Sequence, residues 1–188
     1  MNASEWFYEG IRHMNIKNYE KAIHCFTKSL YYDSQKASPW FNLAIAYLHI
    51  NLDPYFALIF YLINFFSLKS DPYYLENKII TCFQKAISIE PDFLDAWHNL
   101  GYLYYELEEF EKSIDCFKKL LNQNQENVDA LYFLGKIYQE LEDYKSELYY
   151  LKKVVVLIKK TSNLPIREIK KRIKNIEKEY ETILKRKK

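Results

Sequence analysis

The rarest residues of this 188-residue chain recur at a fixed distance along the sequence. Trp6 and Trp40 lie 34 residues apart, and Trp97 follows Trp40 by 57 residues, which is one period of 34 plus 23. The same steps separate a set of small residues and a set of cysteines: Gly10, Ala44, Gly101 and Gly135, and Cys25, Cys82 and Cys116. A fixed period of this length indicates a repeat architecture, here with one 23-residue insertion.

Within each period the apolar residues have helical spacing. Residues 97–104 place apolar or small side chains at i, i+3, i+4 and i+7, which is one face of an α-helix. A second amphipathic stretch follows over residues 110–121 after a short polar break. Each period therefore predicts a helical hairpin. With only three Gly and five Pro, the chain has too few turn residues for a loop-rich β fold.

One period also carries a motif of specific residues, namely Trp97, Leu100, Gly101, Tyr104, Ser113 and Phe117. This motif resembles the tetratricopeptide repeat, whose helix pairs stack into an all-α solenoid. The resemblance implies an array over residues 1–163 with units at 3–36, 37–93, 94–127 and 128–161. The first unit departs from the pattern at Glu9 and His13, which makes its first helix doubtful. In the fourth unit Glu147 replaces a small residue, as expected of a frayed or terminal repeat.

The insertion lies at about residues 51–74 and is apolar nearly all round over 55–68. Pro54 can open a helix there, and a helix of about 14 residues is shorter than the ~20 needed to cross a bilayer. We expect a buried extra helix. Alternatively, 54–68 forms the second helix of the second unit, makes a subunit interface, touches a membrane, or covers the N-terminal half of a binding groove.

The C-terminal tail predicts one further helix. Its apolar residues follow a 3-4-3-4-3 spacing: Ile166, Ile169, Ile173, Ile176, Tyr180 and Ile183. Residues 164–188 therefore suit a basic amphipathic capping helix, or alternatively a coiled-coil partner helix. Residues 145–188 carry a net charge of +10 and the preceding 144 carry −8. Glutamates interleave with the lysines and no row of aromatics accompanies them, so a nucleic-acid partner is not expected.

Residues that could carry chemistry are scarce. The sequence has no Gly-rich phosphate loop, and its four histidines are scattered without the spacing of metal ligands. The three cysteines each precede a phenylalanine and fit small buried side chains. We therefore expect no catalytic residue, metal or cofactor. A secretory leader is not visible and the cysteines show no disulfide pattern, so a cytoplasmic location is expected.

The expected function is to bind another protein. In tetratricopeptide arrays a second stripe on the first helix of each unit lines a concave groove, so the resemblance implies these partner-binding residues: Phe7, Phe41, Asn42, Ile45, His98, Tyr102, Tyr105, Tyr132 and Lys136. Of the positions that grip a chaperone carboxylate in one subtype, only Asn42 fits, so that ligand is not expected. The alternative is an assembly subunit that forms oligomers through its inserted or C-terminal helix.

Overall fold

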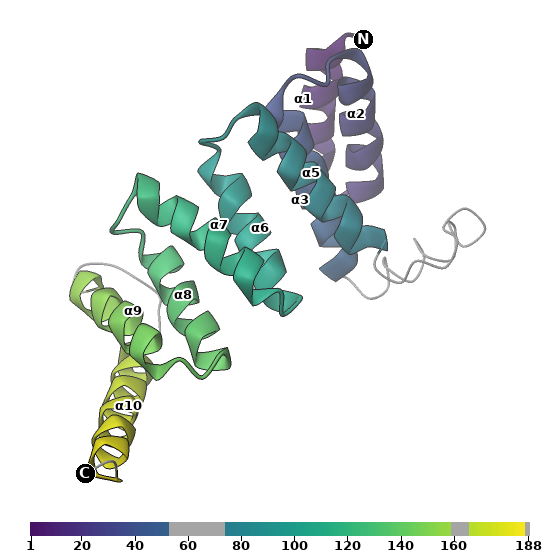
Figure 1. Ribbon diagram of the computed structural model, residues 1–188. Helices are drawn as coiled ribbons and strands as arrows, with labels where there is room; N and C mark the ends of the chain where they lie inside the picture. The colour runs from purple at the N-terminus through teal and green to yellow at the C-terminus, as the bar shows by residue number, and fades with distance from the viewer. Residues whose placement is uncertain (53–73, 159–165, 187–188) are drawn as a thin grey trace. The chain divides into compact units, whose positions relative to one another are not determined.

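The computed structural model describes residues 1–52, 74–158 and 166–186 (Figure 1). Every regular element in these ranges is an α-helix, which confirms the all-α helical-repeat class. The expected helix at 54–68 lies outside the described residues. The elements run in this order: α1 Ala3–Asn15, α2 Tyr19–Tyr32, α3 Ala37–Leu52, α5 Tyr74–Ile89, α6 Leu94–Glu106, α7 Phe110–Gln123, α8 Val128–Glu140, α9 Tyr144–Leu157 and α10 Ile166–Arg186.

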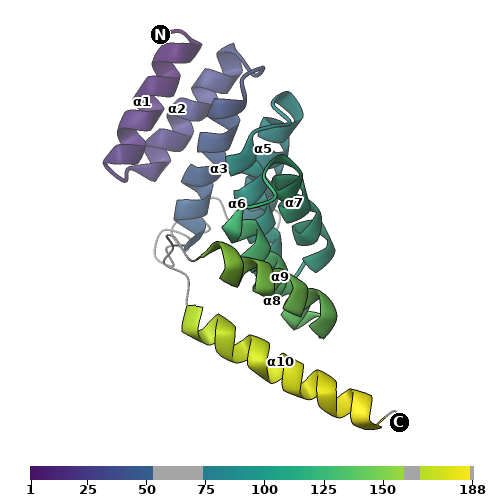
Figure 2. The ribbon, with the colours of Figure 1, turned by 90° about the vertical axis from the view of Figure 1, so that its left-hand side faces the viewer.

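The chain divides into two compact halves, residues 1–100 and 101–188. In the first half α1 packs against α2, α2 against α3, and α3 against α5, as both ribbon views show (Figures 1 and 2). In the second half α7 packs against α8, α8 against α9, and α9 against α10. The helix that pairs with α3 is therefore α5, which carries Cys82 and Phe83 at the positions of Cys25 and Phe26 in α2.

The first helix is complete although Glu9 and His13 depart from the repeat pattern. Asn2 and Glu5 form a capping box in which the Asn2 side chain accepts from the Glu5 amide at 3.0 Å, and the Asn2 amide donates to the Glu5 carboxylate at 2.8 Å. Such a box satisfies two otherwise free amides at a helix start. The prediction that this helix is doubtful was wrong, because α1 runs from Ala3 to Asn15 and begins with a complete capping box.

A left-handed residue closes the first helix of three units. Lys17, Glu108 and Glu142 have φ between 55° and 57° and occupy one position of the period. After each of them an amide bonds back over the helix end, such as Asn18 N to His13 O at 2.9 Å, as in a helix C-cap. In contrast, α3 runs on through Asn51, the equivalent position, to Leu52. The insertion therefore follows a helix that does not turn where the others do.

The glycines mark the closest approach within the hairpins. A Cβ atom at Gly10 would lie 2.5 Å from the ring of Phe26, and one at Gly101 would lie 3.0 Å from Cβ of Cys116. Phe26, Phe83 and Phe117 are fully buried at equivalent positions. In two units, therefore, the glycine of the period meets the phenylalanine of the second helix, and Gly101 also meets Cys116.

The C-terminal helix covers the last hairpin, as the isoleucine spacing predicted. Ile169 and Ile176 are buried in a cluster with Leu151, Val154 and Ile158 of the α9 segment. Glu147 of α9 is fully buried, and Arg172 of α10 donates to it from Nε at 2.7 Å and from a terminal nitrogen at 2.9 Å. The reading of Glu147 as a sign of fraying was wrong, because Arg172 neutralises its carboxylate.

Candidate protein-binding surface

Metal ligands do not gather in the described part of the chain, and its cysteines are buried. No cluster of three or more His, Cys, Asp or Glu able to hold a metal occurs within these residues. Burial raises the pKa of both Cys82 and Cys116 from the usual 9.0 to about 12, which opposes formation of a nucleophilic thiolate. The described helices also include none with the length and apolar character of a membrane span.

Thiol labelling tests this burial. At pH 8 we expect iodoacetamide to label Cys82 and Cys116 slowly in the folded protein and rapidly in denaturant. Between about pH 9 and 12 these thiols ionise in the unfolded chain but not in the folded one, so stability should fall as pH rises. Mass spectrometry of labelled peptides and urea melts at pH 8 and 10 measure both effects. Rapid labelling of folded protein would contradict the assigned burial.

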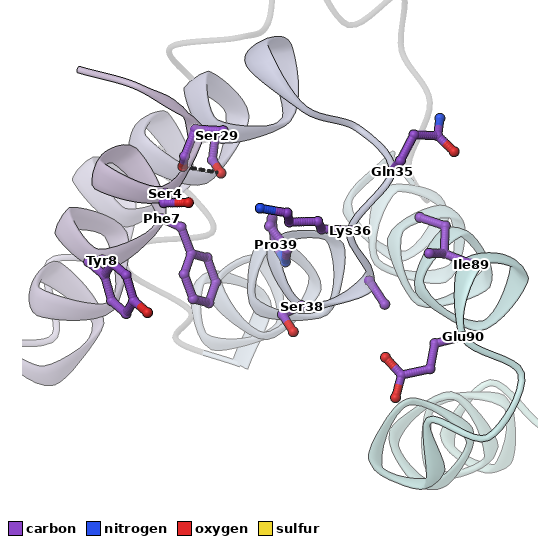
Figure 3. A pocket seen from close by; sticks show the side chains of 12 residues that line it. Ser4, Phe7, Tyr8, Ser29, Gln35, Lys36, Ser38, Pro39, Ile89 and Glu90 are labelled. Carbon is purple, nitrogen blue, oxygen red and sulfur yellow. Dashed lines mark hydrogen bonds between the residues drawn. The ribbon is translucent and has the colours of Figure 1, made fainter.

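In the first half of the chain, Phe7 lines a hollow of about 460 Å³ formed by α1, the start of α3 and the end of α5. Figure 3 shows its ring pointing into this space between Tyr8 and Pro39. The buried Ser29 hydroxyl already donates to the Ala3 carbonyl at 2.7 Å. Ser4, Ser38 and Glu90 add polar groups. Phe7 is thus placed where a partner side chain could reach it.

The other groove residues predicted within residues 1–100 do not line this hollow. Phe41 packs against Phe83 and Phe93, with ring centroids 5.8 and 4.8 Å away. The Asn42 amide donates to the Ser38 carbonyl of its own helix at 2.9 Å. Ile45 and His98 are half-buried. Phe41 therefore takes part in packing, and Asn42 in hydrogen bonding within α3.

In the second half of the chain, three of the predicted tyrosines converge on one phenylalanine. The ring centroids of Tyr102, Tyr105 and Tyr132 lie 5.6, 5.9 and 5.9 Å from that of Phe133. Phe133 in turn stacks in parallel, at 5.1 Å, on the buried ring of Phe117. The structure therefore brings residues of α6 and α8 together around a ring anchored in the core.

Lys136 completes this arrangement. Its ammonium nitrogen lies 5.6 Å from the ring centre of Tyr105 and 5.9 Å from that of Tyr132, both within cation–π range. We call this set the tyrosine face, comprising Tyr102, Tyr105, Tyr132, Phe133 and Lys136. Burial, and then a hydrogen bond with Glu106, raise the pKa of Tyr102.

Sequence reasoning missed Phe133, the centre of the tyrosine face. Its position in the period belongs to Asn42 and Asn99 in the preceding units. Each of those amides donates to a carbonyl of its own helix, at 2.9 and 2.7 Å, as a helix-facing polar group can. A phenylalanine where two units have asparagine is the signal that could have identified it.

A helical-repeat protein with a partly exposed aromatic and charged face belongs to a class built for protein interaction. Three tetratricopeptide repeat models match the sequence: a TPR repeat over residues 101–142, a tetratricopeptide repeat over 82–115, and another over 13–36 and 128–159. Together they cover more than half of the chain. The chain belongs to the tetratricopeptide repeat family. No curated protein matches its sequence.

Several solved structures share the fold at low sequence identity. A tetratricopeptide repeat protein from Parabacteroides merdae is 16% identical, with a TM-score of 0.74 over 95% of this chain and 61% of that one. MamA from Desulfovibrio magneticus is 14% identical, with a TM-score of 0.68 over 97% and 93%. The first TPR domain of Spaghetti (RPAP3), bound to the HSP90 peptide SRMEEVD, is 19% identical, with a TM-score of 0.57 over 75% and 94%.

Proposed function

We propose that the protein is a non-catalytic adaptor that holds a peptide or helix segment of a partner protein at the tyrosine face. The observation that carries this proposal is the convergence of three tyrosines and a lysine on Phe133. Aromatic side chains supply large contact area at little entropy cost and dominate binding energy at interfaces. Because Phe133 rests on buried Phe117, the face is held in place before a partner arrives.

The charges beside the tyrosine face favour a partner of particular chemistry. Glu106, Asp129 and Glu140 are exposed on the same two helices, α6 and α8. The faces of Tyr105 and Tyr132 already attract one cation, Lys136. We therefore expect the bound segment to present apolar or aromatic side chains flanked by Lys or Arg.

The predicted groove residues within residues 1–100 belong to the same proposal. Phe7, in its hollow, is the residue there that a partner could contact directly, whereas Phe41, Asn42, Ile45 and His98 would support the surface from beneath. A chaperone peptide of the kind bound by the RPAP3 domain is a poor fit. The one matching side chain, Asn42, has its amide bonded to the Ser38 carbonyl.

We further propose that residues 1–163 form the four-unit array and that residues 164–188 cap it. The alternative, oligomer formation through the C-terminal helix, is less favoured because the described part of the apolar side of α10 already packs against α9. Ile169 and Ile176 are buried against α9 within the same chain.

The test is affinity capture with the double variant Tyr102→Ala and Tyr132→Ala. Loss of two rings from the tyrosine face should reduce partner recovery at least tenfold, since each interface tyrosine contributes about 1–2 kcal/mol or more. Tyr132 also packs against the Leu131 cluster, so a modest drop in unfolding temperature is expected. Unchanged recovery with a folded variant would refute the proposal.

A further inference from the structure

The indole of Trp6 lacks the hydrogen bond that both of its counterparts make. Trp40 Nε1 donates to the Ser34 carbonyl at 3.0 Å, and Trp97 Nε1 donates to the Pro91 carbonyl at 2.8 Å. Each acceptor lies six residues before its tryptophan. Trp6 Nε1 is buried without a hydrogen-bond partner.

The two acceptor carbonyls share a structural setting. Ser34 follows the end of α2 by two residues, and Pro91 follows the end of α5 by two residues. In both places the tryptophan therefore binds the turn that ends the preceding helix. Among the residues that the structure describes, no carbonyl takes the equivalent place beside Trp6.

A second unpaired atom and a hollow adjoin Trp6. His13 Nδ1 is also buried without a partner, while its Nε2 lies 3.3 Å from the Glu9 carboxylate. A hollow of about 650 Å³ opens at this outer end of the α1–α2 hairpin. We call this surface the end face, lined by Met1, Trp6, Glu9, His13, Glu20, Lys21, His24 and Cys25.

We propose that the end face docks the C-terminal turn of a helix from another protein chain, with a backbone carbonyl accepting from Trp6. A buried donor without an acceptor is destabilising, so an occupant that supplies a carbonyl is favoured over an apolar one. An anionic group is a weaker candidate because Glu9 and Glu20 line the same hollow. A helix end also offers several free carbonyls at once. This surface is separate from the tyrosine face.

A fusion protein tests whether the end face accepts such a turn. Residues 1–36 are placed directly before residues 3–188, which sets the Ser34 carbonyl of the added copy six residues before Trp6. Indole N–H exchange is followed by ¹⁵N NMR. In the fusion, exchange at Trp6 should slow at least about tenfold relative to the parent protein and approach that of Trp40 and Trp97. Unchanged exchange at Trp6 would overturn the proposal.

Trp6→Phe supplies a matched control because it keeps an aromatic ring and removes the donor. In the parent protein this change should cost only the packing of the larger ring against His24, since the lost N–H was unpaired. In the fusion it should lower the unfolding temperature further, because a hydrogen bond is lost as well. Equal effects in both proteins would contradict a hydrogen bond to the docked turn.

Sedimentation of the parent protein identifies the source of the occupant. We expect a monomer, because the proposed occupant is a different protein. A dimer that Trp6→Phe dissociates would show that a second copy occupies the end face and would overturn the assignment to another protein.

Discussion

Replacing Arg172 with leucine is expected to lower the free energy of unfolding by about 3–5 kcal/mol. Glu147 is fully buried, and both of its oxygens accept from the Arg172 guanidinium at 2.7 and 2.9 Å. Without that partner the carboxylate is left in an apolar site with no compensating charge. Urea unfolding followed by circular dichroism measures the loss, and amide exchange over α10 should show that this helix detaches first.

The surrounding residues supply two controls for Arg172. Lys152 and Glu177 also link α9 to α10, but both side chains are about half exposed, so Lys152→Ala should cost no more than about 0.5 kcal/mol. Adding Glu147→Leu to Arg172→Leu should recover most of the lost stability, because the unpaired charge is removed. If Arg172→Leu costs no more than Lys152→Ala, the buried pair does not anchor α10.

Gly10→Ala is expected to lower the free energy of unfolding by about 1–2 kcal/mol. Helix propensity alone predicts the opposite, a gain of about 1 kcal/mol. The added Cβ would lie 2.5 Å from the ring of Phe26, which is fully buried and cannot move without disturbing the core. Overpacking of this kind costs about 1–3 kcal/mol. The sign of the change in urea midpoint therefore decides between the two effects.

Ala44 and Phe26 provide the controls for Gly10. Ala44 occupies the same position of the period and is fully buried, so Ala44→Gly should lose about 1 kcal/mol, the reverse of the exchange at Gly10. Phe26→Leu should shrink the penalty of Gly10→Ala in a double-mutant cycle. A stabilising Gly10→Ala would mean that the two helices are not held as close as the structure places them.

The fold was predictable because the sequence period records direct contacts. Gly10 and Phe26 approach within one hairpin, and Gly101 and Phe117 do so in another. Substituting such residues is restricted by the space between the helices, so they recur where other positions drift. The C-terminal helix was predictable from its isoleucines, since Ile169 and Ile176 form the buried side. These features are local or periodic, which is why pattern reasoning finds them.

The candidate site was only partly predictable, because its contacts depend on residues distant in the chain. Phe41 packs against Phe83 and Phe93, which are more than 40 residues away, so a stripe drawn on one helix does not show these contacts. Phe133 was overlooked because its stacking on Phe117 joins two units of the period. Glu147 was misread because Arg172, its partner, lies 25 residues later in another helix.

The most direct test of the central claim compares partner recovery by three proteins: the parent, the Tyr102→Ala and Tyr132→Ala variant, and a control in which Tyr31 and Tyr32 are replaced by alanine. The control removes two tyrosines that are 82% and 57% exposed on α2. The proposed function predicts at least a tenfold loss for the first variant and recovery equal to the parent for the control. Equal recovery by all three proteins, with each shown to be folded, would contradict a binding role for the tyrosine face.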